Sequence, residues 1–172
     1  MKLSEVKIGK TFNVAGIEFI KFSGDDEKTI AVAKDCMFDS DFGKNNNFAQ
    51  SCILKRLNYE ILPKLEAAVG EENILEHEVD LTSLDGLKTY GRITSKISIP
   101  TIDFYRKNVS IFDKYKLEDW WWLATPDTTP EHYNDRWCRC VWPYGFIYHN
   151  RYLDRNGVRP FCIFASSISV SK

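Results

Sequence analysis

The sequence lacks any apolar run long enough to span a membrane, and residues 1–7 lack the apolar segment of a signal peptide. It also lacks an excess of either charge, since its formal net charge at pH 7 is -1. Bulk electrostatic binding to nucleic acid or to anionic lipid is therefore not expected. These absences predict a protein that is cytoplasmic where it is synthesised and that does not bind membranes.

Paired cysteine spacing is also missing. The sequence holds 5 cysteines, an odd number that favours reduced thiols over a disulfide framework. Cys138 and Cys140 are separated by one residue, whereas zinc-binding pairs ordinarily have two or more between them. His132 and His149 lie close enough in sequence for a four-ligand metal site to be considered, but buried core thiols are the favoured interpretation. We therefore expect no metal and no cofactor.

Recognisable catalytic motifs are absent as well. No Ser-His-Asp order, phosphate-binding glycine loop or nucleotide fingerprint occurs. His77, His132 and His149 have no sequence neighbours that would serve as a catalytic base and its orienting group. The sequence thus predicts no catalytic residue and a protein that is not an enzyme.

What the sequence does contain fits a single domain of residues 1–172 in the α+β class. Residues 7–34 read as short β-rich runs with a hairpin turn at residues 24–26. Residues 37–47 read as a loop, part of which should pack down through its own Phe38 and Phe42. The tail after residue 166 alternates apolar residues with serines and is expected to pair with an N-terminal strand.

Two helices are expected in the middle of the chain. Ser51 is a candidate N-cap for the first, and Pro63 should kink it or start a second segment that Gly70 ends. Its apolar stripe would consist of Leu54, Leu57, Ile61 and Leu65. The second helix should begin near Pro100, with Thr101 or Ser98 as its cap, and end near Asn108.

All 5 tryptophans lie in the C-terminal third, between Trp120 and Phe164. Successive strand residues point to opposite faces, so Trp120, Trp121 and Trp122 cannot share one environment, and we assign them structural roles in the core and between layers. A strand over 136–142, a turn at 143–145 and a returning strand predict a hairpin. A turn at 154–157 then leads into one final apolar strand over 158–164.

Arg159 stands between apolar residues of that final strand. A buried guanidinium must be paired, so we interpret Arg159 as structural and expect Asp119 or Asp80 to accept its hydrogen bonds.

Residues 127–156 are rich in Tyr, Trp, Arg and Asn, the residue types that dominate recognition surfaces. We therefore predict a ligand-binding surface in this insert. Its candidate residues are Tyr133, Asn134, Arg136, Trp137, Arg139, Tyr144, Tyr148, His149, Asn150, Arg151 and Tyr152.

The Tyr133-Asn134-Asp135 tripeptide, with Glu131 nearby, is similar to the Trp-Asn-Asp calcium motif of sugar-binding lectins. Its tryptophan is replaced by Tyr133 and the companion tripeptide is missing. Because calcium needs six or more oxygens from several segments, a solvated polar loop is the favoured interpretation.

Two motifs carry a resemblance: Trp-Trp-Leu-Ala-Thr-Pro at 121–126 and Gly-Val-Arg-Pro at 157–160. They resemble a large family of uncharacterised domains of gut bacteria and their phages. Upstream stretches also match: residues 7–12, 47–51, 57–58, 79–81 and 85–86. The family often has arginine where this chain has Ala124, so any role of that arginine is absent.

The motif pair is in turn similar to strands of C-type-lectin-like domains, which include formylglycine-generating-enzyme-like proteins and the variable proteins of diversity-generating retroelements. The resemblance implies a C-type-lectin-like domain with paired N- and C-terminal strands, two helices, and C-terminal antiparallel strands that carry long display loops.

The leading function hypothesis is a non-enzymatic module of bacterial or phage origin that binds a protein or a glycan through residues 127–156. A second hypothesis is a phage-encoded cytoplasmic inhibitor or accessory protein that acts on a host protein, with a virion-associated location as the alternative. A third is a thiol- or metal-dependent oxidase of the formylglycine-generating type; Cys138, Cys140 and Cys162 are the cysteines to test for it, although no family motif maps them onto the cysteine pair of those enzymes.

Overall fold

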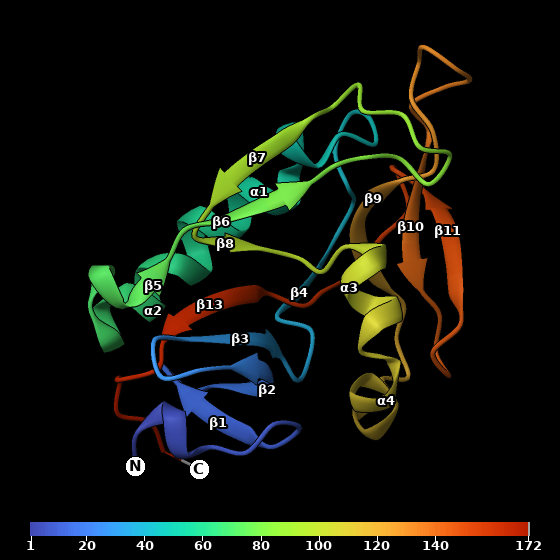
Figure 1. The fold of residues 1–172 in the computed structure, drawn as a ribbon. Helices are drawn as coiled ribbons and strands as arrows, with labels where there is room; N and C mark the ends of the chain where they lie inside the picture. Colours follow the sequence, from blue (N-terminus) through green and yellow to red (C-terminus); the bar gives the residue numbers. More distant parts are fainter. Residues whose placement is uncertain (172) are drawn as a thin grey trace.

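The computed structural model describes residues 1–171 and has a mixed α+β fold. Within those residues, the strands form sheets of six, five and two strands (Figure 1). The mixed α+β class expected from the sequence is confirmed.

The six-stranded sheet contains the N-terminal strands and the last strand of the chain, in the order β1-β2-β3-β13-β5, with β8 also paired to β13. Its strands are β1 (Thr11–Val14), β2 (Ile17–Gly24), β3 (Lys28–Ala33), β5 (Ile74–Leu75), β8 (Ile97–Ser98) and β13 (Phe161–Ala165). Ala15 and Gly16 both have positive φ in the tight turn between β1 and β2. The β structure predicted over 7–34 is confirmed.

The five-stranded sheet has the order β11-β10-β9-β12-β4. Its strands are β4 (Phe38–Ser40), β9 (Trp121–Pro126), β10 (Trp137–Val141), β11 (Ile147–Arg151) and β12 (Asn156–Val158). The prediction of a loop throughout 37–47 was wrong for β4, which pairs with β12. The small sheet consists of β6 (His77–Asp80) and β7 (Arg92–Ser95).

The first helical region begins as predicted, because the Ser51 hydroxyl accepts a hydrogen bond from the Leu54 amide at 3.0 Å. It comprises α1 (Cys52–Arg56), a π-helical turn at Leu57–Ile61 and α2 (Leu62–Val69), preceded by a 3₁₀ turn at Phe48–Gln50. Pro63 has no N–H to offer in a regular helix, and the turn before it is widened so that Leu62 donates to the Leu57 carbonyl. Gly70, at φ +91°, ends the helix.

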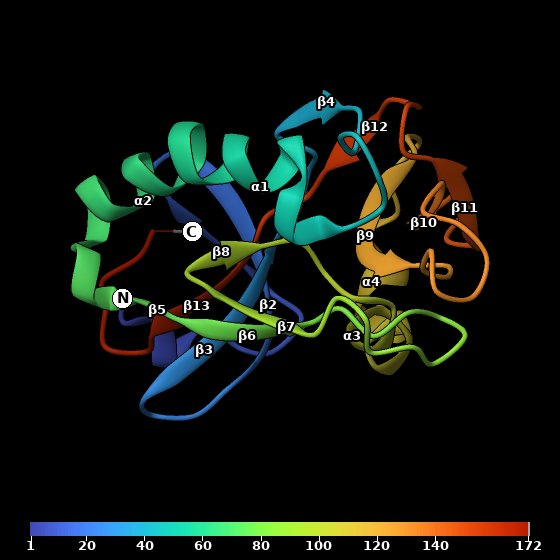
Figure 2. The ribbon, with the colours of Figure 1, turned by 90° about the horizontal axis from the view of Figure 1, so that it is seen from above.

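Thr101 caps the second helical region by accepting from the Phe104 amide. Helix α3 (Ile102–Lys107) stops at Asn108 as predicted, and a further turn, α4 (Val109–Phe112), follows it. Shorter 3₁₀ turns occupy Leu3–Glu5, Glu71–Asn73 and Asp113–Tyr115. Figure 2 shows α1 and α2 running along one side of the molecule, whereas α3 and α4 lie beside β9.

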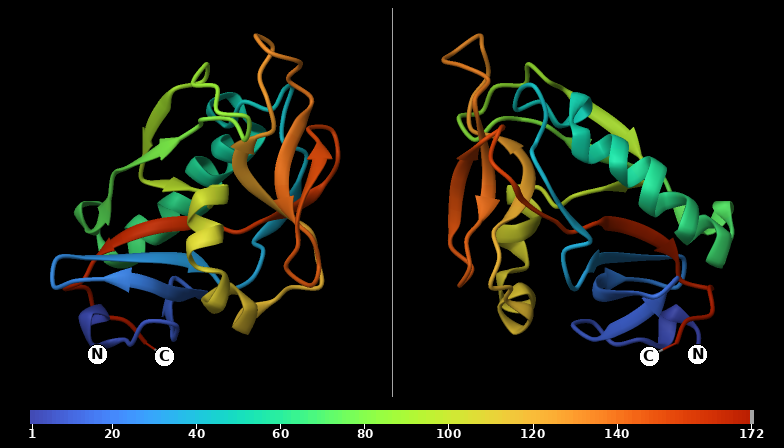
Figure 3. Two further views of the ribbon diagram at one scale, coloured as in Figure 1. Left: turned by 45° about the vertical axis from the view of Figure 1, so that its right-hand side comes forward. Right: turned by 180° about the vertical axis from the view of Figure 1, so that it is seen from behind.

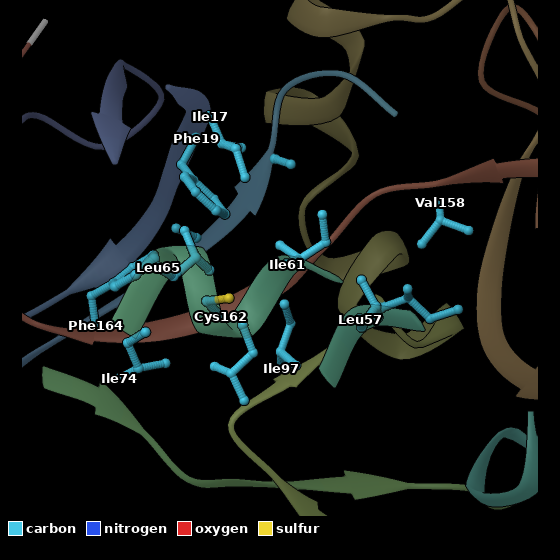
Figure 4. Packing of buried hydrophobic residues seen from close by; sticks show 14 of the residues in the cluster. Ile17, Phe19, Leu57, Ile61, Leu65, Ile74, Ile97, Val158, Cys162 and Phe164 are labelled. Carbon is cyan, nitrogen blue, oxygen red and sulfur yellow. The ribbon is translucent and has the colours of Figure 1, made fainter. Parts of the chain in front are cut away.

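Two apolar clusters lie on opposite faces of the strands. The larger one joins α1 and α2 to the six-stranded sheet, and it includes Leu57, Ile61 and Leu65 of the helical region with Cys162 and Phe164 of β13 (Figure 4). The smaller one joins α3 and α4 to both sheets. Trp122 belongs to the larger cluster and Trp121 to the smaller, as strand alternation requires.

The final strand predicted over 158–164 is two strands in different sheets. β12 pairs with β4 and β9, and β13 pairs with β3 after a break at Arg159 and Pro160. Pro160 cannot donate to a ladder, but its carbonyl accepts from the Ala33 amide at 2.8 Å. The chain therefore crosses from one sheet to the other at this point.

The tail packs against the N-terminal segment, as expected. The Leu3 amide donates to the Ile168 carbonyl at 2.9 Å, and single β-bridges join Lys2 to Ser169 and Asn13 to Ser171. Figure 3 shows the two ends of the chain side by side in both views.

Arg159 is buried, but its predicted acidic partners were wrong. Its Nε donates to the Ala33 carbonyl at 3.0 Å, and its guanidinium lies 4.7 Å from the centre of the Trp121 ring and 5.3 Å from that of Phe112. Burial lowers the pKa of Arg159 to about 10. The aromatic rings and one carbonyl take the place of a carboxylate because a planar guanidinium stacks well on π faces.

Replacing Arg159 by lysine should lower the free energy of unfolding by roughly 1–3 kcal/mol, because an ammonium group cannot reproduce the planar stacking in a buried site. Urea denaturation of the Arg159→Lys variant measures this. The exposed Arg155→Lys serves as the matched control and should stay within about 0.5 kcal/mol of the unmodified protein. Equal stability of the two variants would contradict the stacking role.

Candidate functional site

The predicted hairpin of β10 and β11 forms one end of the five-stranded sheet (Figures 1 and 3). Its register is regular from Trp137 opposite Arg151 to Val141 opposite Ile147. In the turn, the Gly145 amide donates to the Trp142 carbonyl at 2.8 Å. Tyr144 has φ +80° there, a conformation that glycine adopts far more readily.

Aromatic side chains gather on this hairpin and the adjoining Trp120. Trp120 and Trp142 stack with ring centres 5.2 Å apart, and Tyr148 meets both rings edge-on. The exposed fractions are 74% for Tyr144, 68% for Phe146, 45% for Tyr148 and 40% for Trp142. We call these five residues the aromatic face. It offers rigid apolar area to solvent, which is uncommon unless a partner covers it.

The structure distributes the predicted binding residues over several environments. Tyr133, Arg136, Tyr144, Tyr148 and Arg151 are exposed. Asn134, Trp137, Arg139, His149, Asn150 and Tyr152 are half-buried.

The prediction did not include Trp142 and Phe146, and it assigned Trp120 a structural role only. Strand alternation pointed Trp142 to the same side as the buried Cys138 and Cys140, so no local signal revealed its exposure. Trp142 lies past the end of β10, where its ring reaches Trp120 instead of the core.

The other side of the hairpin carries a charged cluster. The Asp127 carboxylate lies 2.6 Å from Arg139 Nε and 3.1 Å from His149 Nδ1. The His149 ring also lies against Trp137, with ring centres 5.0 Å apart. Arg139 and His149 thus already have a carboxylate partner within the chain. Fewer of their hydrogen-bond donors are available to a ligand than the sequence suggested.

The loop that precedes β10 is fixed by Asn46, which is fully buried. Its Nδ2 donates to the carbonyls of Thr128 and Trp137 at 2.9 and 3.0 Å, and its Oδ1 accepts from the Tyr90 hydroxyl at 2.7 Å. Its backbone amide donates to the Asp135 carbonyl. The Asn46 side chain therefore holds Thr128 and Trp137, at the two ends of the loop, against the body of the protein.

The residues considered for calcium make local contacts instead. Asn134 Oδ1 accepts from the Arg136 amide at 2.9 Å, and Glu131 accepts from the Thr89 hydroxyl at 2.9 Å. His132 lies 2.7 Å from Asp85, whose pKa is lowered to about 2 because hydrogen bonds from Ser83 and His132 outweigh the effect of burial. The polar loop is tied to the neighbouring 83–89 segment by these pairs.

The environment of the buried cysteines lowers the reactivity of their thiols. Cys138, Cys140 and Cys162 are buried, and desolvation raises the pKa of all three thiols, that of Cys140 to about 12. A thiol in such surroundings has little thiolate character and is a poor nucleophile. Within residues 1–171, no three His, Cys, Asp or Glu side chains converge as a metal site would need.

His77 forms a second polar pair far from the hairpin. Its Nε2 lies 2.8 Å from the Ser98 hydroxyl, beside a pocket of about 220 Å³ that Phe161 also lines. Burial lowers the pKa of His77 from 6.5 to about 4. Ser98 is only 1% exposed, and the His77 Nδ1 atom is buried without a hydrogen-bond partner. We interpret the pair as a buried structural contact.

No protein-family model, no curated protein and no solved structure matches this chain. Among the helices of residues 1–171, none has the length and apolar character required to cross a membrane.

Replacing Asn46 by alanine should lower the free energy of unfolding by about 2–3 kcal/mol, since three buried hydrogen bonds are lost. The freed loop should also be cut faster by trypsin after the exposed Arg136. Urea denaturation and timed proteolysis measure the two effects. Asn45→Ala, which removes contacts within its own loop only, is the control, and equal cleavage of both variants would contradict the anchoring role.

Lowering the pH from 7 to 4.5 should destabilise the protein through His77. In this window the unfolded chain binds a proton that the folded His77 excludes, so stability falls as pH drops below 6.5 and levels off below 4. A His77→Gln variant should lose about 2 kcal/mol less than the unmodified protein over this range. Urea titrations at both pH values test this, with the exposed His132→Gln as the control. An unchanged pH dependence in His77→Gln would contradict the effect.

Proposed function

We propose that the protein is a non-enzymatic binding module that contacts a protein or a glycan through the aromatic face and the adjoining loop of 127–136. The proposal extends the function expected from the insert 127–156 and moves its centre to the tip of the hairpin. It rests on five aromatic side chains gathered at one sheet end, four of which are exposed.

The observation that carries the proposal is Tyr144. A tyrosine at φ +80° costs about 1 kcal/mol relative to a relaxed backbone, and its side chain is 74% exposed, so little packing repays that cost. Strained residues of this kind concentrate at functional sites. A contact with a ligand gives a physical reason for an aromatic residue where glycine would fit better.

Rigid support for the tip favours the same interpretation. The Tyr105 hydroxyl, on α3, donates to the Gly145 carbonyl at 2.6 Å. A side chain on Gly145 would meet Tyr105 and Lys116 at 3.3 Å, so the tip sits close against the body of the protein. A preorganised surface loses less conformational entropy on binding.

We further propose that the fold is C-type-lectin-like and that the chain belongs with the domains of gut bacteria and phages that its motifs resemble. Support comes from the adjacent termini, from the Trp-Trp-Leu strand at the centre of one sheet, and from the Gly-Val-Arg-Pro segment that leads into the other. If the chain is encoded by a phage and its ligand is a host protein, the protein would act as an inhibitor of that host protein or as an accessory to it.

The test combines a glycan array with capture of proteins from a bacterial lysate, using the full chain. With the ligand obtained, Tyr148→Ala should weaken binding by about tenfold or more, as expected for a central aromatic contact. Tyr144→Gly should weaken binding and raise the free energy of unfolding by roughly 1 kcal/mol, because the backbone strain is relieved.

The matched control is Tyr59→Ala. Tyr59 is 82% exposed on the helical segment between α1 and α2, and its removal should change neither binding nor stability. Equal losses in Tyr59→Ala and Tyr148→Ala, or an absence of ligand in both arms, would reject the proposed function.

A further inference from the structure

Strand β11 is the last strand of its sheet, so one of its sides has no neighbouring strand within residues 1–171. The Trp142 amide donates to the Phe146 carbonyl, and the Tyr152 amide to the Arg136 carbonyl. Between these two bonds the pairing is regular, so the backbone groups of residues 148 and 150 face β10. Those of Ile147 and His149 must face outward.

The outward backbone groups remain open only in the middle of the strand. At its end, the Arg151 amide and carbonyl bond to Asp154 in the following turn, at 2.8 and 2.9 Å. Within the described residues, Ile147 and His149 thus present two amide donors and two carbonyl acceptors without a hydrogen-bond partner. An extended chain pairs with such a row of groups.

The other end of the same sheet is protected. The Asp39 carbonyl of β4 accepts hydrogen bonds from Arg56 and Arg155 at 3.2 and 3.0 Å. The Arg56 guanidinium also covers the Phe38 ring at 3.7 Å. β11 contains no proline and no bulge that would prevent pairing with a further strand. Of the two edge strands of this sheet, β11 is therefore the one that is free to pair.

We propose that β11 binds an extended segment of a partner polypeptide, which adds an antiparallel or parallel strand beside Ile147–Arg151. This inference rests on the proposed function and narrows its ligand to a peptide. The backbone groups of Ile147 and His149 supply hydrogen bonds, and side-chain alternation supplies specificity.

The side chains flanking the edge define the chemistry of the peptide. Tyr148 belongs to the aromatic face, so the segment needs a large apolar or aromatic side chain on that side. On the opposite side Arg151 is exposed, and no carboxylate of the described residues lies within ion-pair distance of it. An acidic side chain placed three residues from the apolar one lies on the opposite face of the added strand and complements this guanidinium.

A second copy of the chain fits the edge less well. Antiparallel pairing of two β11 strands about His149 would set the two imidazoles opposite each other and each Arg151 opposite an Ile147. This arrangement supplies no opposite charge to either guanidinium. A peptide from another protein has no such constraint on its sequence.

The experiment selects binders from a random dodecapeptide library against the full chain and measures the affinity of a synthetic peptide from that selection. His149→Pro removes the outward N–H without touching the ladder to β10, whereas His149→Ala removes the imidazole and keeps the N–H. The proline variant should bind the peptide at least about tenfold more weakly than the alanine variant. The selected peptides should share an apolar and an acidic residue at fixed spacing.

Amide exchange provides a second measurement that does not depend on the folding of a variant. In the unmodified protein, the amides of Ile147 and His149 should exchange rapidly and become protected when the synthetic peptide is added. Unprotected amides, or equal affinities of the two His149 variants, overturn the edge-strand proposal.

The remaining outcomes separate this proposal from the proposed function. Failure to select any peptide, combined with glycan binding that Tyr148→Ala weakens, overturns edge pairing and leaves the aromatic face as a binding surface. A dimer that His149→Pro dissociates assigns the edge to a second copy and likewise overturns the peptide proposal.

Discussion

The passage of the chain from one sheet to the other at Gly157–Pro160 is the constraint on which the rest of the structure depends. The Gly157 amide donates to the Trp120 carbonyl at 2.8 Å, and a β-carbon at Gly157 would collide with Cys36 Sγ. Two residues later, Arg159 lies buried against Trp121 and bonds to Ala33 of the six-stranded sheet. Gly157 and Arg159 therefore fix how the two sheets pack against each other, and this packing sets the position of the hairpin of β10 and β11.

The hairpin itself combines a rigid frame with an unpartnered surface. Asn46 holds the loop before it and Tyr105 holds its tip, so the aromatic face is presented without large freedom of movement. Several polar residues of the insert contact one another, since Asp127 pairs with Arg139 and His149. What stays open to solvent is mainly the aromatic rings and the outer backbone of β11, which are the features that an incoming extended chain would use.

Local signals in the sequence were sufficient for features that depend on neighbouring residues. Ser51, Pro63 and Gly70 delimit the first helix because capping, a missing N–H and a positive φ act within one turn. The alternation of Trp121 and Trp122 between two clusters follows from strand geometry alone.

Features that depend on tertiary neighbours were not predictable. β4 forms because β12 lies beside it, Arg159 finds aromatic rings in place of the expected carboxylates, and the exposure of Trp142 depends on Trp120, far away in the sequence.

The adjacency of the two chain ends has a consequence for how the molecule can be attached. Met1 and Val170 are joined by a hydrogen bond of 2.9 Å between the Val170 amide and the Met1 carbonyl, on the opposite side of the molecule from β10 and β11 (Figures 1 and 2). A tether fused at either end would leave from the same corner and would keep the hairpin pointing away from the anchoring surface. The fold thus suits immobilisation on a bead, a particle or another protein without obstruction of the aromatic rings.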